Sequence, residues 1–144
     1  MYRLALEYDK PLCEWLKQRV PHFYPSDGVK CVGVIRGGKL VAAVAYSGYF
    51  AGNDHWSPDV EMTAAADSPR WWSRSVGRDM LGIPFRQFGC ERITLRVRKK
   101  DKRTRRFVEG IGFKLEGIIR RALRSDDACL YGLTRRDWER GKYV

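Results

Sequence analysis

The chain has 144 residues, of which 44% are hydrophobic and 12% aromatic. That content supports one domain with a real core and argues against disorder. No apolar run approaches the roughly 20 residues needed to span a bilayer. The first twenty residues also lack the apolar centre of a signal peptide. We therefore expect a single domain over residues 1–144, a cytoplasmic location and no membrane partner.

The net charge of +11 is distributed unevenly along the chain. Residues 91–144 carry 17 Lys and Arg against 8 Asp and Glu, a net +9. Residues 1–90 carry 11 against 9, a net +2. A positive field of this kind attracts a polyanion such as nucleic acid, or a multiply phosphorylated cofactor. The four cysteines form no C-x-x-C pair and the two histidines are far apart, so we expect no metal site.

The first predicted element is a helix over residues 10–20. Asp9 is placed as its N-cap and Pro11 lies in its first turn. Pro21 and Pro25 then end the helical pattern.

Three strands and a helix are predicted next. Segments 29–36 and 39–50 flank Gly37-Gly38 and predict a β-hairpin. Residues 59–66 form a strand with Val60, Met62 and Ala64 on one face and Glu61, Thr63 and Ala65 on the other. Residues 71–88 follow the helical pattern, which Pro84 kinks or interrupts.

The final third gives the clearest pattern. Residues 91–98 alternate as a strand. Asp101 can cap the helix that follows, and Gly112 ends it. Two closing strands are predicted at 113–119 and 128–135, joined by a turn at 125–127. The order predicts a mixed α/β domain rather than a regular βαβα alternation.

Basic residues surround the helix that Asp101 opens. Lys99, Lys100, Lys102 and Arg103 adjoin backbone amides that favour an anion. The spacing alone leaves two interpretations open, a phosphate contact and an ordinary solvated basic face.

The run from Val97 to Gly117, VRKKDKRTRRFVEGIGFKLEG, resembles a pattern of the GNAT N-acetyltransferases. That pattern is a strand, then N-x-x-S/T-x-x-F/Y-x-x-x-G-F, then E-G. The segments IIRRALR at 118–124 and LYGLTRRDW at 130–138 resemble the last strands of the branch that acetylates ribosomal proteins. The resemblance covers nearly the whole chain, weakly before residue 59 and well after residue 90.

The resemblance implies a GNAT-like α/β fold with flanking helices. Its central, mostly antiparallel sheet would be splayed between two adjacent parallel strands, here 59–66 and 91–97, with acetyl-CoA in the gap. The family binds the pyrophosphate through a Q/R-x-x-G-x-G/A loop, which Arg70 could open, although Ser73 and Ser75 replace the glycines. The residues that the resemblance assigns to the cofactor are Thr63, Ala64, Arg70, Trp72, Ser73, Arg74, Ser75, Asp101, Arg103, Thr104 and Phe107.

Two positions depart from the family pattern in ways that affect the mechanism. Asp101 stands where Asn is usual, and Phe107 stands where many members have the Tyr that protonates the leaving thiolate. That proton would then come from solvent, from Tyr131, or from the hydroxyl of Ser68 or Thr104.

Glu61 is the candidate base for the attacking amine, because it lies on the strand beside the expected gap. The alternative is that Glu61 only pairs with an arginine of an adjacent strand. His55 and Asp59 are weaker candidates just upstream.

We therefore expect an acetyl-CoA-dependent N-acetyltransferase that acts by direct transfer to a primary amine of a small molecule or protein. One alternative is acetylation of an amine on nucleic acid, such as aminoacyl-tRNA or a modified base, which rests on charge alone. Another is a non-catalytic GNAT-like binding module. The oligomeric state is open, and a dimer is one expectation.

Overall fold

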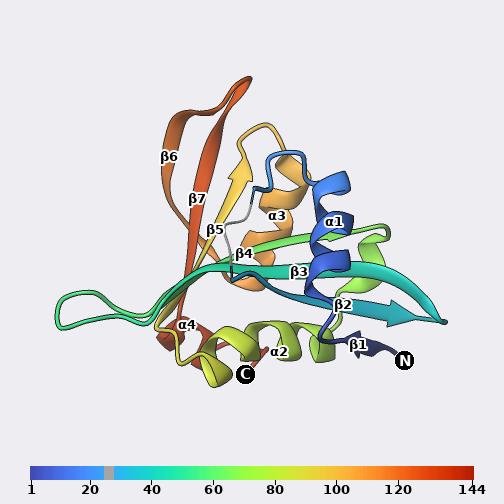
Figure 1. Cartoon of the computed structure of the whole chain (residues 1–144). Helices are drawn as coiled ribbons and strands as arrows, with labels where there is room; N and C mark the ends of the chain where they lie inside the picture. Colours follow the sequence, from blue (N-terminus) through green and yellow to red (C-terminus); the bar gives the residue numbers. More distant parts are fainter. Residues whose placement is uncertain (25–27) are drawn as a thin grey trace.

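The fold is built around a single β-sheet (Figure 1). The computed structural model describes residues 1–24 and 28–144. Within them, seven strands pair in the order β1-β2-β3-β4-β5-β7-β6. Their bounds are β1 Arg3–Ala5, β2 Lys30–Arg36, β3 Lys39–Phe50, β4 Asp59–Ala66, β5 Arg92–Arg98, β6 Lys114–Leu123 and β7 Asp126–Thr134. Every neighbouring pair is antiparallel except β4 and β5, so the predicted mixed, mostly antiparallel fold class is confirmed.

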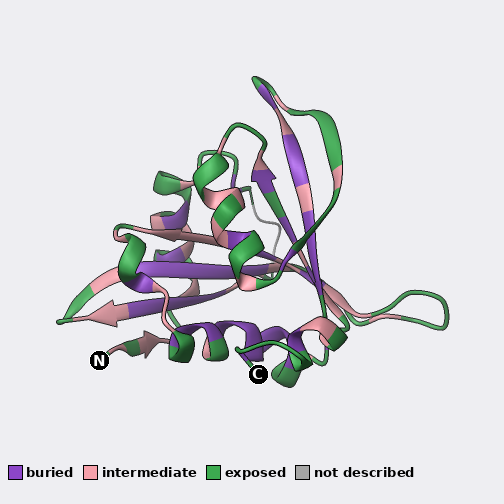
Figure 2. Cartoon of the chain, turned by 180° about the vertical axis from the view of Figure 1, so that it is seen from behind, coloured by how far each residue is buried: buried purple, intermediate pink, exposed green. Residues whose placement is uncertain are grey.

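Helices cover both faces of this sheet (Figures 1 and 2). Helix α1 packs on one face, against β2, β3 and β4. Helices α2 and α3 lie on the other face, over the larger of two hydrophobic clusters. The bounds are α1 Asp9–Arg19, the 3₁₀ turn η1 Pro69–Trp71, α2 Arg74–Gly82, the π-helical turn η2 Ile83–Gln87, α3 Lys102–Ile111 and α4 Arg135–Glu139.

The parallel pair β4–β5 separates soon after it begins. The two strands pair only at Asp59–Arg92, Val60–Ile93 and Glu61–Thr94. Beyond that point β4 stays paired with β3 as far as Ala66, while β5 stays paired with β7 along its whole length. Each strand therefore follows its other neighbour, and the sheet opens between them as the resemblance implied.

Several local predictions are confirmed. Gly37 and Gly38 turn the β2–β3 hairpin with φ of 58° and 74°, values that glycine adopts without strain. Asp101 caps α3 by accepting a hydrogen bond from the Thr104 backbone N–H at 3.1 Å. Gly112 ends α3 with φ of 124°.

The start of α1 differs from the prediction. Tyr8 occupies the N-cap position, and Asp9 is the first helical residue. The Asp9 carboxylate instead accepts from the Cys31 backbone N–H at 2.9 Å, which ties α1 to β2. The helix ends at Arg19, before Pro21, and Pro25 lies outside the described residues.

The predicted helix 71–88 is divided into three parts. Pro84 has no backbone N–H and lies in η2, where the Phe88 N–H donates to the Ile83 carbonyl in the π-helical manner at 3.0 Å.

The closing hairpin also differs, because its strands are longer and its turn lies earlier than 125–127. The last strand stops at Thr134 instead of residue 135. The Thr134 hydroxyl accepts from the Asp137 backbone N–H at 3.2 Å and caps α4, which the sequence interpretation did not include.

Alternation along β4 and β5 sends apolar side chains to one face of the sheet. Val60, Met62, Ile93 and Leu95 are at most 6% exposed and belong to the larger cluster beneath α2 and α3. Glu61 and Thr63 consequently point to the α1 face. No helix in residues 1–24 and 28–144 is long and apolar enough to cross a membrane.

Candidate functional site

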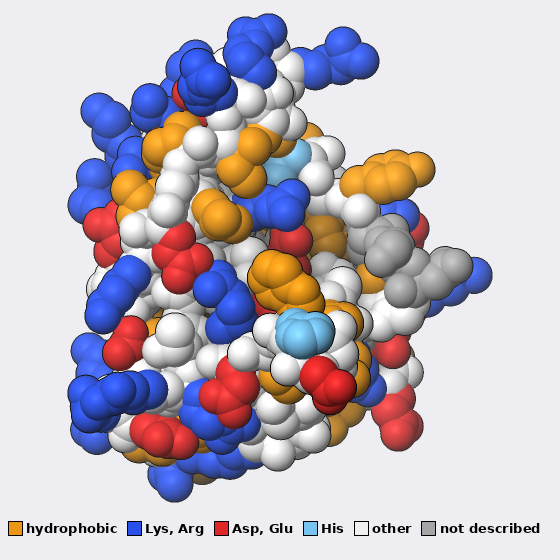
Figure 3. Space-filling view, turned by 90° about the vertical axis from the view of Figure 1, so that its left-hand side faces the viewer, with side chains coloured by type: hydrophobic (Ala, Val, Ile, Leu, Met, Phe, Trp, Pro, Cys, Tyr) orange, Lys and Arg blue, Asp and Glu red, His pale blue; other side chains and the backbone are white. Residues whose placement is uncertain are grey.

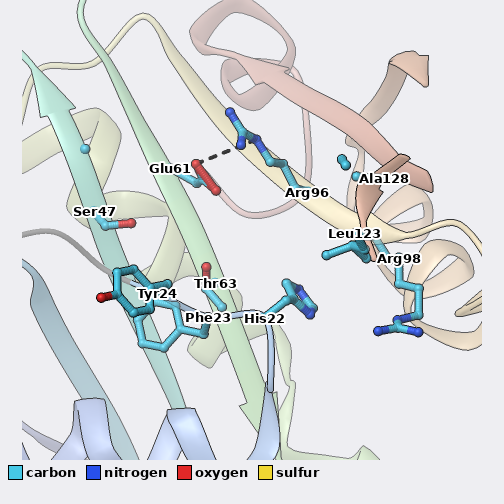
Figure 4. Close-up of a pocket in the computed structure, with 13 residues that line it drawn as sticks. His22, Phe23, Tyr24, Ser47, Glu61, Thr63, Arg96, Arg98, Leu123 and Ala128 are labelled. Carbon is cyan, nitrogen blue, oxygen red and sulfur yellow. Dashed lines mark ion pairs between the residues drawn. The ribbon is translucent and has the colours of Figure 1, made fainter. Parts of the chain in front are cut away.

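A cavity of about 360 Å³ lies on the α1 face, where β4 and β5 part (Figure 4). The loop after α1, the strands β3, β4 and β5, and the β6–β7 hairpin all contribute to its walls. The lining residues are His22, Phe23, Tyr24, Ser47, Gly48, Glu61, Thr63, Arg96, Val97, Arg98, Ala122, Leu123 and Ala128. The cavity thus joins segments far apart in sequence at the point where the sheet opens.

Glu61 and Arg96 face each other across the mouth of the splay (Figure 4). Arg96 Nε lies 3.9 Å from Glu61 Oε1, and the two side chains are 55% and 33% exposed. The alternative expectation, that Glu61 pairs with an arginine of an adjacent strand, is therefore met by Arg96. A pair this long and this exposed contributes little stability, so both groups remain available to a ligand. The role of Glu61 as a base stays a prediction.

Asp59, one of the weaker candidates, is held in a tighter network. The Thr94 hydroxyl lies 3.0 Å from both Asp59 carboxylate oxygens, and Arg92 Nε lies 3.6 Å from one of them. Arg92 also pairs with Glu116 at 2.8 Å. This network closes the end of the gap where the strands still pair. His55 is exposed in the loop before β4 and does not line the cavity.

His22 lines the cavity, although sequence reasoning assigned it no role. Partial desolvation and the positive charge of Arg98 lower its pKa, while Asp101 opposes the shift. The imidazole is therefore neutral at neutral pH and can accept a proton. Its sequence position gave no signal, because only the fold brings the loop after α1 to the open strands.

Arg98 forms part of the cavity wall beside the β6–β7 hairpin. Its Nη1 donates to the Ser125 hydroxyl at 3.3 Å. The alternation of Thr94, Arg96 and Arg98 along β5 was visible in the sequence and placed these arginines on the face opposite the core. The cavity that these arginines line was not predicted from the sequence.

The β6–β7 hairpin, which contributes to the cavity wall, carries exposed positive charge. Figure 3 shows Lys and Arg side chains gathered at the top of the molecule, the height at which the β6–β7 hairpin lies in Figure 1. Arg120, Arg121 and Arg124 are exposed in that hairpin. Their field raises the local concentration of anions.

The predicted cofactor residues of the 70–75 loop lie at the start of α2, on the opposite face. The Ser73 hydroxyl accepts from the Val76 N–H at 3.1 Å, and Ser73 is the N-cap. The backbone N–H groups of Arg74 and Ser75 have no acceptor among the described residues. Arg74 Nε donates to the Lys142 carbonyl at 3.2 Å, whereas Arg70 is exposed.

An aromatic cluster fills the space between α2 and α3. Trp72 packs edge-on against Trp71, Phe107 and Tyr143, with ring centroids 5.1 to 5.6 Å apart. The Trp72 Nε1 is buried without a hydrogen-bond partner among the described residues. Phe107 is therefore a packing partner of this tryptophan, whichever other contact it makes.

The remaining cofactor candidates are split between α3 and β4. Asp101 is engaged as the α3 cap, Thr104 is half-buried, and Arg103 is exposed on the basic face. Thr63 lines the cavity and Ala64 packs against the larger cluster, so these two side chains lie on opposite faces of the splayed strand. Their contacts with a cofactor stay predictions.

Tyr131, the second catalytic candidate, is buried beneath α3. Its hydroxyl donates to Glu109 and accepts from Arg105 Nε at 3.1 Å. Burial raises the pKa of Tyr131. The side chain belongs to the larger cluster, on the face opposite Glu61. The fold therefore does not bring the two predicted catalytic residues together on one face, and the role of Tyr131 as a proton donor stays a prediction.

The open part of the splay has the character of a site for an extended ligand. Among residues 1–24 and 28–144, no strand pairs with the edge of residues 62–66 that faces β5, yet backbone amides are obligatory hydrogen-bonding groups. The pantetheine arm of coenzyme A carries amides that can pair with such an edge. The free amides at the start of α2 suit its phosphates. The residues present therefore fit coenzyme A at the splay.

Solved structures share the architecture of this chain. No protein-family model matches the chain, and no curated protein matches it. A chimera of Vibrio cholerae spermidine N-acetyltransferase SpeG and hSSAT superposes with a TM-score of 0.76 at 12% identity, covering 96% of this chain and 98% of that one. The chain has the GNAT fold.

Two more GNAT structures extend the comparison. The ribosomal-protein-S5-alanine acetyltransferase of Vibrio fischeri gives a TM-score of 0.70 at 14% identity, covering 95% of this chain and 94% of that one. Mutant forms of the Vibrio cholerae spermidine/spermine N-acetyltransferase SpeG give 0.71 at 12% identity, covering 97% and 98%. The structural neighbours are thus GNAT acetyltransferases, and identities this low establish the shared fold alone.

Proposed function

We propose that this protein is an N-acetyltransferase that moves an acetyl group from acetyl-CoA directly to a primary amine. The observation that carries the proposal is the three-residue β4–β5 pairing, which leaves the edge of residues 62–66 open. That edge lies between a charged cavity on the α1 face and the start of α2 on the other. A cofactor and an acceptor could thus meet there from the two faces.

The open edge and α2 would hold the cofactor. Backbone groups of residues 62–66 would pair with the pantetheine amides, and one N–H would polarise the thioester carbonyl. The free amides of Arg74 and Ser75, with the Arg70 side chain, would bind the phosphates. Bound acetyl-CoA supplies an acetyl thioester, whose C–S bond is exchanged for a C–N bond to the amine.

The cavity would receive the amine, which must lose a proton to react. Glu61 on β4 and the neutral His22 are the two lining groups that can accept this proton, directly or through water. Phe107 has no proton to give, and the Tyr131 hydroxyl is bonded to Glu109 on the other face. The leaving thiolate would therefore take its proton from solvent or from the hydroxyl of Ser68 or Thr104.

Thiol release from acetyl-CoA in the presence of a panel of primary amines tests this proposal. Glu61→Gln keeps the shape of the side chain but removes its basicity. It should lower kcat by about 10²–10⁴-fold, with little effect on acetyl-CoA affinity. His22→Gln tests the second base in the same way, and Glu139→Gln is the matched control because Glu139 is exposed on α4, outside the cavity.

Each outcome bears on a separate part of the mechanism. Unchanged turnover in Glu61→Gln would assign the proton transfer to His22 or to solvent. If the wild-type protein released no thiol with any amine, the transferase proposal would fail.

A further inference from the structure

The walls of the cavity carry more positive than negative charge. Arg96 and Arg98 contribute two guanidinium groups from one face of β5, and Glu61 contributes the carboxylate. Their guanidinium groups diverge, because Arg96 points toward Glu61 whereas Arg98 points away from it and reaches Ser125 (Figure 4). Arg96 and Glu61 thus place one positive and one negative group side by side at the mouth of the splay.

These two guanidinium groups are poorly satisfied by the protein itself. Arg96 makes no hydrogen bond to any described residue, and its carboxylate partner is 3.9 Å away. Arg98 donates to the uncharged Ser125 hydroxyl and has no carboxylate within 4 Å in the described chain. Arg92 on the same strand differs, since it bonds Thr94 and pairs with Glu116 at 2.8 Å. Each guanidinium has five N–H donors, so Arg96 and Arg98 have donors left for a ligand.

This charge pattern argues against a polycationic acceptor. Some of the structural neighbours are spermidine N-acetyltransferases by name. A polyamine needs several carboxylates, whereas the described lining of this cavity contains Glu61 alone among Asp and Glu. Two arginines would repel it, and the exposed arginines of the β6–β7 hairpin would add to the repulsion.

We propose that the acceptor is a small amine that also carries an oxyanion, a carboxylate or a phosphate. The oxyanion is held by Arg96, while the amine faces Glu61, and Arg98 adds positive charge to the cavity wall. Guanidinium groups match both kinds of oxyanion through paired N–H donors. A cavity of about 360 Å³ has the size of a small-molecule site. This inference deepens the proposed function and rests on it for the reaction, although the binding preference can be measured without turnover.

Calorimetric titration with matched amines tests the preference. The probes are β-alanine for the carboxylate, O-phosphoethanolamine for the phosphate, n-propylamine as the analogue without an oxyanion, and spermidine as the polycation. Both anionic amines, or one of them, should bind at least tenfold more tightly than n-propylamine and spermidine. The better of the two identifies the oxyanion.

Charge-removing variants locate the effect. Arg96→Gln should reduce the affinity for the preferred oxyanion-bearing amine by on the order of tenfold and leave n-propylamine unchanged, and Arg98→Gln should have a smaller effect in the same direction. Arg78→Gln removes one positive charge at an exposed position of α2, on the other face, and should change neither affinity. The proposal is overturned if neither oxyanion-bearing probe binds, if n-propylamine binds as tightly as the oxyanion-bearing amines, or if Arg78→Gln acts like Arg96→Gln.

The same compounds in the thiol-release assay separate the two proposals. Turnover with every amine at equal kcat/KM would leave the transferase standing and reject the anionic acceptor. Selective binding of an anionic amine without thiol release would support the binding preference and reject the transferase.

Discussion

Replacing Gly77 by alanine tests how α2 packs at its start. An ideal Cβ at this position would lie 2.6 Å from Tyr143 Cδ1 and 2.7 Å from Trp72 Cζ2. Neither ring can move freely, because Tyr143 is 9% exposed and Trp72 is packed against Trp71 and Phe107. Overpacking of this kind costs about 1–3 kcal/mol. Alanine also favours a helical backbone by about 0.5–1 kcal/mol, which offsets part of that cost.

Gly110 is the matched control, because it lies in α3 with no atom within 4 Å of an added Cβ. Gly110→Ala should gain only the preference of alanine for a helical backbone, which stabilises the protein by about 0.5–1 kcal/mol. Since Gly77→Ala gains the same preference, it cancels roughly when the two variants are compared. Gly77→Ala should have the lower free energy of unfolding, by about 1–3 kcal/mol.

Urea denaturation of both variants and the wild type measures this difference directly. In thermal unfolding, each kcal/mol corresponds to a shift in Tm of about 2–4 °C for a chain near this length. If Gly77→Ala were as stabilising as Gly110→Ala, the packing described for Trp72 and Tyr143 would be wrong.

Two further predictions concern α3 and the cavity. Asp101→Ala should lower the free energy of unfolding by about 0.5–2 kcal/mol, because the Thr104 N–H loses its hydrogen-bond acceptor. Asp101→Asn should retain most of this stability, because its side-chain oxygen can still accept that bond. An equal loss of stability in both variants would contradict the capping role. The lowered pKa of His22 predicts a pH effect on stability, since the unfolded chain binds the proton first as the pH falls below 6.5. The stability that the neutral His22 contributes is fully present above pH 6.5 and is lost as the pH falls toward the pKa of His22 in the folded protein. Below pH 6.5 the free energy of unfolding of the wild type should therefore fall relative to that of His22→Gln. Parallel pH profiles of the two proteins would count against the lowered pKa.

Local chemistry made much of the fold predictable. The alternation of residues 91–98, the Asp101 cap and Gly112 each specify a conformation over a few neighbouring residues, and the structure has all three. Elements that depend on competition between local signals were harder to predict. Asp9 is a good cap residue, but its carboxylate bonds the Cys31 amide across the fold instead. Pro84 interrupts a helical pattern, and the sequence did not predict that a π-helical turn would result.

The site shows the same division. The predicted positions of Glu61 and Thr63 on one face of β4 follow from a period of two residues, and both line the cavity. The Tyr131 hydroxyl makes this residue a candidate proton donor in the sequence, but the register of β7 places the side chain beneath α3 on the other face. His22 could not be identified, since it reaches the cavity only when α1 packs across β2 to β4.

Isothermal titration calorimetry of the wild-type protein with acetyl-CoA tests the central claim most directly. The free edge of residues 62–66 and the amides at the start of α2 predict saturable one-to-one binding of acetyl-CoA. An absence of binding at high micromolar acetyl-CoA would contradict the proposal that the splayed strands of this protein form a cofactor site.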